Sequence, residues 1–313
     1  MKPQPYEEVS QRIRQQFEAW KAAQTAPIAR LRFSWSIWGF GQEGLAASCA
    51  RLRRNGIEYV ELCGNHHTAL SGETPAAVRH ILQEEGLQVS GACGIFSPDI
   101  DLSSNRVLQR QAAQDYILRE AEFLQEVGGQ YLLLVPGAVG RPAPYDDAEE
   151  QRSVDSLRRV ADVFLRTGVK GAIEPIRAEE VSLVHTLEEA ERYLKRLDHP
   201  GVAWINGDVY HMQTSERHIG AAILAHGERL LNLHVADSHR GALGEGMLDL
   251  DTVIRALYLI GQNREGRFVT AEPLGPGCNP YVAMNGRPAP ASLDRLVAQT
   301  AAAFREREEA LLA

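Results

Sequence analysis

The sequence between residues 168 and 274 contains four short apolar runs, GVKGAIEPI (residues 168–176), GVAWINGDVYHM (residues 201–212), LLNLHVADSHR (residues 230–240) and RFVTAEPL (residues 267–274). Near its end each run carries a side chain able to bind a metal ion: Glu174, Asp208, His234 and Glu272. In a closed parallel barrel the carboxyl ends of all strands open onto one face. The pattern therefore predicts that these four side chains gather at one mouth of a barrel.

The rest of the chain repeats the same unit, a short apolar strand followed by an amphipathic helix, which indicates a parallel sheet covered by helices. We expect strands at residues 32–38, 58–63, 87–95, 130–136, 169–175, 202–206, 230–236 and 267–273. We expect helices after them at residues 45–54, 75–85, 106–127, 148–166, 186–196, 215–226, 249–260 and 291–309. Eight units in about 280 residues match a (β/α)8 TIM barrel in number and size.

An extra helix is expected before the first strand, because Val9, Ile13, Phe17 and Trp20 recur at helical spacing. The rival fold, a doubly wound open sheet, favours a glycine-rich phosphate turn, and the sequence contains neither GxGxxG nor GxxxxGK[ST]. We therefore predict a single domain over residues 1–313, with the extra helix at about residues 6–21 and the barrel at about residues 31–311.

Composition narrows the class of partner. The chain has 313 residues, a net charge of −8 and no basic block, which argues against nucleic acid because phosphate neutralisation needs clustered Lys and Arg. The N-terminus lacks a signal-peptide core, and no run reaches the roughly 20 apolar residues of a membrane helix. The four cysteines are far apart and form no CxxC motif, which indicates thiols in a reducing cytoplasm. We expect a cytoplasmic protein with a small-molecule substrate and no membrane contact. The sequence leaves open whether it forms a homo-oligomer.

The predicted ligand set, three carboxylates and one imidazole, is mostly hard. Such a set suits Mn²⁺ or Mg²⁺ best, and it also accepts Co²⁺ or Zn²⁺. Carboxylates that converge without a counter-charge resist joint ionisation, and a bound cation removes that penalty. Any one of these residues alone would be interpreted as a salt-bridge partner. Together they predict one divalent metal ion, Mn²⁺ by preference, bound by Glu174, Asp208, His234 and Glu272.

Two further residues lie close in sequence to predicted ligands. His211 follows Asp208 by three residues, and Arg240 follows His234 by six. We expect both to contact the substrate beside the metal ion. The alternatives are a local hydrogen bond at a helix start for the histidine and a surface salt bridge for the arginine.

Other candidate substrate-binding residues follow the early strands. His66 and His67, in the loop after the second strand, could bind sugar hydroxyls. Trp38 and Phe96 are expected at the ends of strands one and three, where an aromatic wall suits the apolar face of a sugar. The alternatives are ordinary loop histidines and core aromatics.

At these residues the chain resembles the xylose isomerase-like barrel superfamily of sugar phosphate isomerases and epimerases. Its motifs are most similar to those of the ketose 3-epimerases, the tagatose and allulose 3-epimerase group. The matching segments are AIEP with Glu174, DVYHM with Asp208 and His211, HVADSHR with His234 and Arg240, and AEP with Glu272. That group also carries a second Glu a few residues past the strand-five ligand, and this sequence offers Glu179 and Glu180 there.

The resemblance implies a metal-dependent sugar or polyol isomerase or epimerase, moving a proton at a carbon next to a carbonyl through a metal-bound enediolate. It implies that Glu174 and Glu272 flank the sugar and act as the catalytic base and acid. A lyase or dehydratase that eliminates from a keto-sugar or keto-inositol in the same site is the main alternative. A non-catalytic sugar-binding barrel and a subunit completed by a partner are others. The DNA-repair branch of the superfamily has further metal ligands after its strand-seven histidine, in the region where this sequence has Gly244-Glu245-Gly246-Met247.

Overall fold

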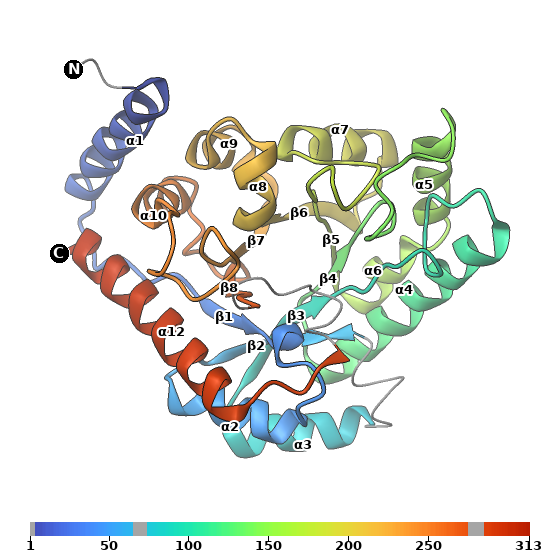
Figure 1. The fold of residues 1–313 in the computed structure, drawn as a ribbon, viewed down its shortest axis with the longest axis horizontal. Coiled ribbons are helices and arrows are strands. Elements are labelled where there is room, and N and C mark those ends of the chain that lie inside the picture. Colours follow the sequence, from blue (N-terminus) through green and yellow to red (C-terminus); the bar gives the residue numbers. More distant parts are fainter. Residues whose placement is uncertain (1–3, 65–73, 275–284) are drawn as a thin grey trace.

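The computed structural model describes residues 4–64, 74–274 and 285–313. Its eight strands are parallel and form a closed barrel in sequence order, with β8 paired to β1 (Figure 1). The strands are β1 (Phe33–Ser36), β2 (Tyr59–Cys63), β3 (Gln88–Cys93), β4 (Tyr131–Leu134), β5 (Lys170–Ile173), β6 (Val202–Asp208), β7 (Leu230–Val235) and β8 (Phe268–Ala271). The predicted (β/α)8 TIM barrel is confirmed.

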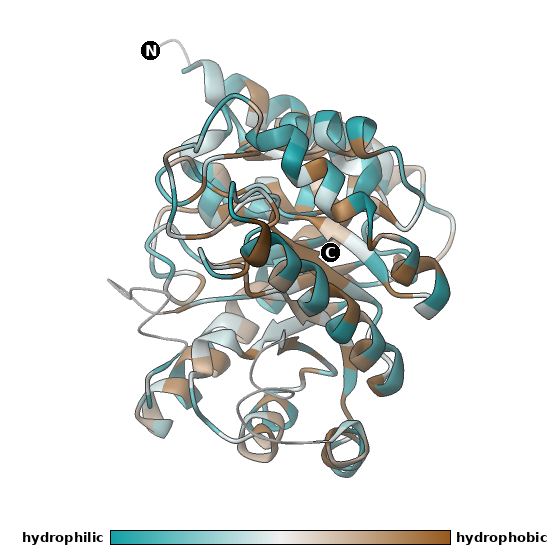
Figure 2. Cartoon of the chain, turned by 90° about the vertical axis from the view of Figure 1, so that its right-hand side faces the viewer, coloured by the Kyte–Doolittle hydropathy of each residue, from teal (hydrophilic) through white to brown (hydrophobic). Residues whose placement is uncertain are grey.

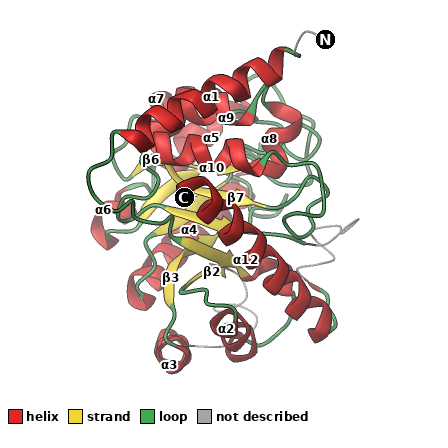
Figure 3. Ribbon diagram, turned by 90° about the vertical axis from the view of Figure 1, so that its left-hand side faces the viewer, coloured by secondary structure: helices red, strands yellow, loops and turns green. Residues whose placement is uncertain are grey.

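Helices enclose the strands on all sides (Figures 1 and 3). The α-helices are α1 (Pro5–Ala22), α2 (Leu45–Arg54), α3 (Pro75–Glu85), α4 (Val107–Val127), α5 (Glu149–Arg158), α6 (Asp162–Thr167), α7 (Leu187–Leu197), α8 (Val209–Ser215), α9 (Ile219–His226), α10 (Leu250–Leu259) and α12 (Pro290–Leu312). The described residues also form the 3-10 turns η1 (Ile37–Phe40) and η3 (Gly227–Arg229). Most helices carry both hydrophilic and hydrophobic residues (Figure 2), as helices of an outer ring do.

The predicted extra helix, α1, precedes the first strand and packs outside the ring against α10 and α9 (Figure 1). Its buried residues are Ile13 and Phe17, and the Phe17 ring lies 6.1 Å from that of Tyr258 on α10. Lys21, at its end, donates a hydrogen bond of 3.0 Å to the carbonyl of Leu311 on α12. These contacts connect α1 to the last helix of the barrel.

Several element boundaries differ from the prediction, and two of the differences position the site. β1 ends at Ser36, which is its last residue paired with β2. The chain then turns into η1, so Trp38 lies on that turn instead of at a strand end. β6 continues to Asp208, which starts α8 directly. The helix expected at residues 148–166 is divided into α5 and α6, and the carbonyl of Ala161 at the break packs on Gly201 before β6.

The barrel interior is layered. Near the amino ends of the strands, Tyr131, Ala172, Leu231 and Phe268 form a small buried apolar cluster. Above it lie buried polar side chains from six strands: Ser34, Glu61, Ser90, Asn206, Asn232 and Thr270. They bond to one another, because a buried polar group without a partner is costly. Asn232 donates to Asn206 at 2.8 Å and accepts from Thr270 at 2.8 Å. This polar layer supports the side chains at the mouth.

Among the residues that the structure describes, no helix is long and apolar enough to cross a membrane. Cys49, Cys63 and Cys93 are buried thiols. Cys278 lies outside the described residues.

Candidate metal centre and active site

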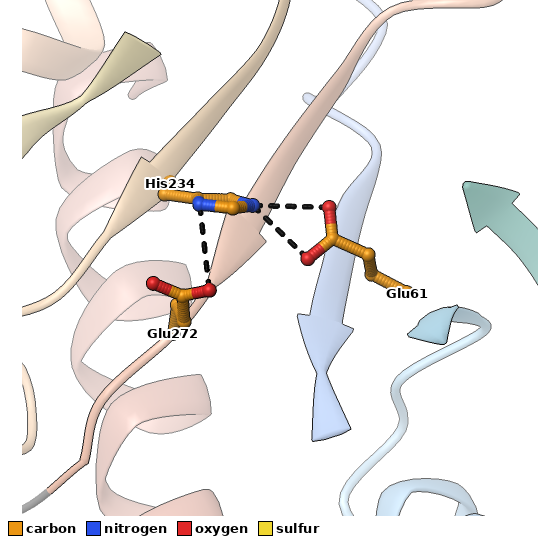
Figure 4. Close-up of side chains that lie close together, drawn as sticks. All are labelled: Glu61, His234 and Glu272. Carbon is orange, nitrogen blue, oxygen red and sulfur yellow. Dashed lines mark hydrogen bonds and ion pairs between the residues drawn. The ribbon is translucent and has the colours of Figure 1, made fainter. Parts of the chain in front are cut away.

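The imidazole of His234, at the end of β7, lies between carboxylates on two sides (Figure 4). Its Nδ1 is 3.5 Å from Oε1 of Glu272 and 3.6 Å from Oε1 of Glu174. Its Nε2 is 3.0 Å from each carboxylate oxygen of Glu61 on β2. The two ring nitrogens therefore face different partners.

Asp208 completes the group on the Nδ1 side. It is paired in register with His234 across β6 and β7, and one donor atom from each of Glu174, Asp208 and His234 lies within 4.8 Å of the others. Oδ1 of Asp208 accepts a 2.8 Å hydrogen bond from the backbone N–H of Tyr210, so Asp208 caps α8. The structure thus brings Glu174, Asp208 and Glu272 close to the imidazole of His234.

The geometry of these donors fits a divalent cation. Two ligands on a cation with bonds of about 2.1 Å lie about 3 to 3.6 Å apart, depending on the coordination geometry. The separations of 3.5 and 3.6 Å at His234 Nδ1 are of this size. The buried Oδ2 of Asp208 has no hydrogen-bond partner among the described residues. An orphaned carboxylate oxygen beside two further carboxylates is what a cation site requires.

Burial governs the charges of this group. Burial raises the pKa of Glu174 to about 7, although His234 opposes it, and raises the pKa of Asp208 to about 6. Burial alone would lower the pKa of His234, but Glu272 and Glu61 raise that pKa well above its ordinary value. The metal-free site therefore retains protons among its donors, and a bound cation would displace them.

Arg240, in the loop after β7, is buried and touches the ligand group. Its guanidinium donates a 2.6 Å hydrogen bond to Oε2 of Glu272 and lies 3.7 Å from Oδ2 of Asp208. It also lies over two aromatic rings, with centroids 5.5 Å away for Trp38 and 4.8 Å away for Tyr210. Arg240 is only 5% exposed, so its alternative interpretation as a surface salt bridge is wrong.

Asp237 holds the loop that carries Arg240. Its carboxylate accepts hydrogen bonds from the backbone N–H groups of Ser238, Gly244 and Leu248 at 2.7, 2.8 and 3.1 Å. The loop turns sharply enough that Arg240 has a φ of 60°, a conformation that costs free energy in any residue except glycine. The buried Asp237 therefore determines where the guanidinium of Arg240 lies.

The other predicted substrate-binding residues have different outcomes. His211 is buried at the start of α8, with Nε2 3.4 Å from Oδ2 of Asp208 and with an Nδ1 that has no partner within the described part of the chain. Burial lowers the pKa of His211 well below its ordinary value, so its imidazole is neutral. Trp38 faces the same cavity from η1. His66 and His67 lie outside the described residues.

A cavity opens beside the ligand group. Its polar lining includes Glu174, Glu180, His211, Arg240 and Glu272, and its apolar lining includes Trp38, Ile95, Phe96, Val135, Val139 and Ile176. Phe96, expected at the end of strand three, lies beyond the end of β3 at Cys93. Of the pair Glu179 and Glu180, Glu180 lines the cavity, and its carboxylate accepts a 2.6 Å hydrogen bond from Arg177. A cavity with apolar walls and a few convergent polar groups is typical of a small-molecule site.

Sequence reasoning missed two residues that contact the ligands. Glu61 faces His234, and Asn206 donates a 3.1 Å hydrogen bond to Oε1 of Glu174. A signal for each was present. Glu61 is an acidic residue inside a run that reads as a buried strand. Asn206 precedes Asp208 by two residues, so strand alternation puts both side chains on one side.

Comparison with known proteins gives a consistent result. The family model for the xylose isomerase-like TIM barrel matches residues 49–289. The ketose 3-epimerase of Arthrobacter globiformis is 30% identical over 224 residues, which cover 71% of this chain and 76% of that protein. The 3-dehydro-D-guloside 4-epimerase of Escherichia coli K12 is 33% identical over 228 residues, 70% of this chain and 84% of that protein.

Solved structures show the same fold. The D-allulose 3-epimerase from Methylomonas sp., in complex with D-allulose, superposes with a TM-score of 0.75 at 23% identity and covers 90% of this chain and 99% of that one. The 3-keto-D-glucoside 4-epimerase from E. coli superposes with a TM-score of 0.70 at 26% identity and covers 85% of this chain and 99% of that one.

Proposed function

This chain belongs to the xylose isomerase-like TIM barrel family, and on that premise we propose that it is a sugar epimerase that depends on a divalent metal ion. Its named relatives are epimerases, which makes it an isomerase. Those names describe reactions at C3 of a ketose and at C4 of a 3-keto sugar. In both cases the reacting carbon is next to a carbonyl, so one acid–base site serves either substrate.

One observation carries the proposal. Glu174 and Glu272 reach the same nitrogen of His234 from β5 and β8, two strands separated in the barrel by β6 and β7, and both line the cavity. A sugar in this cavity would have a carboxylate on each side. One carboxylate would remove the proton next to the carbonyl, and the other would return a proton to the opposite face.

We assign the metal ion to Glu174, Asp208, His234 and Glu272, with Mn²⁺ as the preferred ion. An ion bound there supplies Lewis-acid polarisation of the substrate carbonyl. Asn206 orients Glu174 through its 3.1 Å hydrogen bond, and Arg240 orients Glu272 through its 2.6 Å bond. Each carboxylate is thus held in place by a buried donor.

The remaining polar residues would hold the sugar. The neutral imidazole of His211 has a buried Nδ1 without a partner in the described part of the chain, so it can accept or donate a hydrogen bond to a substrate oxygen. Trp38, with an indole N–H that likewise has no partner among the described residues, offers an aromatic face and a donor. We expect His211 and Trp38 to orient the sugar and to exclude water.

Solvent exchange tests the reaction. The purified chain, loaded with Mn²⁺, is incubated in D₂O with D-allulose and, separately, with a 3-keto-D-glucoside, and the products are analysed by mass spectrometry and NMR. We expect one deuterium at the epimerised carbon and no other change in mass. We expect the exchange to fall by about 10²- to 10⁴-fold in Glu174→Gln and in Glu272→Gln.

Other outcomes identify other functions. Loss of water or of an aglycone would show elimination in place of epimerisation. Binding of a sugar by calorimetry, with no deuterium entering it, would show a binding protein. Near-normal exchange in both Gln variants would contradict the assignment of the two carboxylates.

A further inference from the structure

Glu61 is a fully buried carboxylate in the middle of β2, and nothing described so far gives it a role in the reaction. Both of its oxygens lie 3.0 Å from Nε2 of His234, on the edge of the ring away from Glu174 and Glu272 (Figure 4). It belongs to the polar layer of the barrel and is absent from the cavity lining. Glu61 therefore touches a metal ligand without facing the space where a sugar would lie.

Glu61 could in principle be a ligand, because Glu61, His234 and Glu272 also form a group of donors within 4.8 Å. The direction of the imidazole lone pair argues against it. An ion bound by Nε2 would lie about 2.1 Å along the lone-pair axis of that nitrogen. The carboxylate of Glu61 faces Nε2 with both oxygens and occupies this direction (Figure 4). The Nε2 side of the ring accommodates a hydrogen bond, and only the Nδ1 side has donors arranged for an ion.

The fold provides for this contact in two independent ways. The pairing of β2 with β3 shifts register between Val60 and Glu61, and such a bulge redirects the side chain that follows it. On the neighbouring strand, Glu61 is paired with Gly91, where an added Cβ would lie 2.5 Å from the ring of Tyr131. The missing side chain lets Tyr131 extend into the barrel and donate a 2.5 Å hydrogen bond to Oε2 of Glu61.

We propose that Glu61 is a positioning residue that fixes the ring orientation and tautomer of His234 for the metal ion. The inference rests on the proposed function, since it assigns Glu61 a role toward the ion of that site. A carboxylate that accepts the Nε2–H bond leaves the Nδ1 lone pair for the metal and raises the basicity of the ring. Tyr131 holds the carboxylate in place from the other side.

Metal affinity and the tautomer of His234 test the proposal in the full-length, metal-stripped chain. Mn²⁺ affinity is measured by calorimetry, and the imidazole tautomer is read from long-range ¹H–¹⁵N NMR spectra with diamagnetic Mg²⁺. Loss of an outer partner of a metal-binding histidine costs about 10- to 100-fold in affinity. We expect a fall of about tenfold in Glu61→Gln, which keeps an acceptor but loses the charge. In Glu61→Ala the Mn²⁺ affinity should fall further, and His234 should show a mixture of tautomers.

The chain offers a matched control in Glu308 on α12. This residue is also a fully buried carboxylate, and it accepts a 2.7 Å hydrogen bond from the hydroxyl of Tyr258. It contacts Leu31 at the start of the barrel and does not line the cavity. Glu308→Gln should lower the melting temperature as a buried substitution does, while Mn²⁺ affinity and the His234 tautomer stay unchanged. A role for Glu61 in stability alone would make the two Gln variants behave alike.

The remaining outcomes separate this inference from the proposed function. Unchanged Mn²⁺ affinity and an unchanged tautomer in both Glu61 variants would overturn the positioning role and leave the metal site intact. Glu61→Gln is a conservative substitution. Complete loss of metal binding in this variant would mean that Glu61 is itself a ligand. A wild-type chain that binds no divalent ion would overturn both proposals.

Discussion

The guanidinium of Arg240 donates a 2.6 Å hydrogen bond to the carboxylate of Glu272, and it does so from a backbone with a φ of 60°. Backbone strain of this kind persists only where the surroundings enforce it, and it is common at functional sites. The guanidinium carbon also lies over the rings of Trp38 and Tyr210. The contact connects the loop after β7 to the last predicted metal ligand.

Arg240→Lys should therefore lower kcat/KM by about 100-fold, comparable to losing one preorganised donor. A lysine keeps the charge, but its ammonium lacks the planar guanidinium that bonds to Glu272 while lying over the two rings. Steady-state kinetics on the substrate found by solvent exchange provide the measurement. Arg255→Lys on α10, whose guanidinium pairs with Asp251 away from the cavity, is the control and should keep full activity. An Arg240→Lys variant with wild-type kcat/KM would refute a role for the guanidinium plane.

Asp237→Ala should impair catalysis although Asp237 does not line the cavity. It removes the acceptor of three backbone N–H groups, which then lack a partner, and we expect a loss of about 1 to 3 kcal/mol in the free energy of unfolding. Because the same loop carries Arg240, kcat should also fall, by about tenfold or more. Denaturant titration and kinetics measure the two effects. Asp249→Ala, which removes the cap of α10 and the acceptor of a hydrogen bond from Ser10, both away from the cavity, should lower stability while kcat stays the same.

The stability of the metal-free protein should fall as pH rises from about 5 to 8. The pKa values of Glu174 and Asp208, about 7 and 6, lie above their unfolded values, so the folded state binds more protons than the unfolded state in this range. The raised pKa of His234 acts in the same direction, since its contribution is present at low pH and is lost as pH rises. The lowered pKa of His211 acts in the opposite direction, but it is one group against three. Thermal unfolding across this range should show a midpoint that declines by several degrees. Glu174→Gln should flatten the decline, and a midpoint that rose with pH would contradict these protonation states.

Binding of Mn²⁺ should release protons, more at pH 6.5 than at pH 8.5. Ligands must lose their protons before they bind, and Glu174 with its pKa of about 7 is largely protonated only at the lower pH. Calorimetry in buffers of different ionisation enthalpy counts the protons released. Removal of the ion with a chelator should abolish solvent exchange, and Mn²⁺, Mg²⁺ or Co²⁺ should restore it. Full activity after exhaustive chelation would eliminate the metal-dependent mechanism.

Local patterns were sufficient for the architecture and for the side of the barrel that carries the site. Apolar runs, helical spacing and strand ends are properties of a few consecutive residues, so the sequence alone predicted eight strand–helix units and the placement of Asp208, His234 and Glu272 at strand ends. Alternation along a strand also determines which residues point inward, and it made Asn206 predictable from Asp208. The metal-binding role of these residues stays a prediction.

Contacts across the barrel depended on tertiary structure, because they arise from strands far apart in sequence and from register shifts that no local pattern records. The bulge before Glu61 and the absent side chain at Gly91 decide that Glu61 meets Nε2 of His234. The end of strand pairing at Ser36 decides that Trp38 lies on a turn facing the cavity, and the loop held by Asp237 decides that Arg240 is buried. The sequence by itself determined which side chains reach the mouth of the barrel, and only the closure of the barrel decided which of them touch.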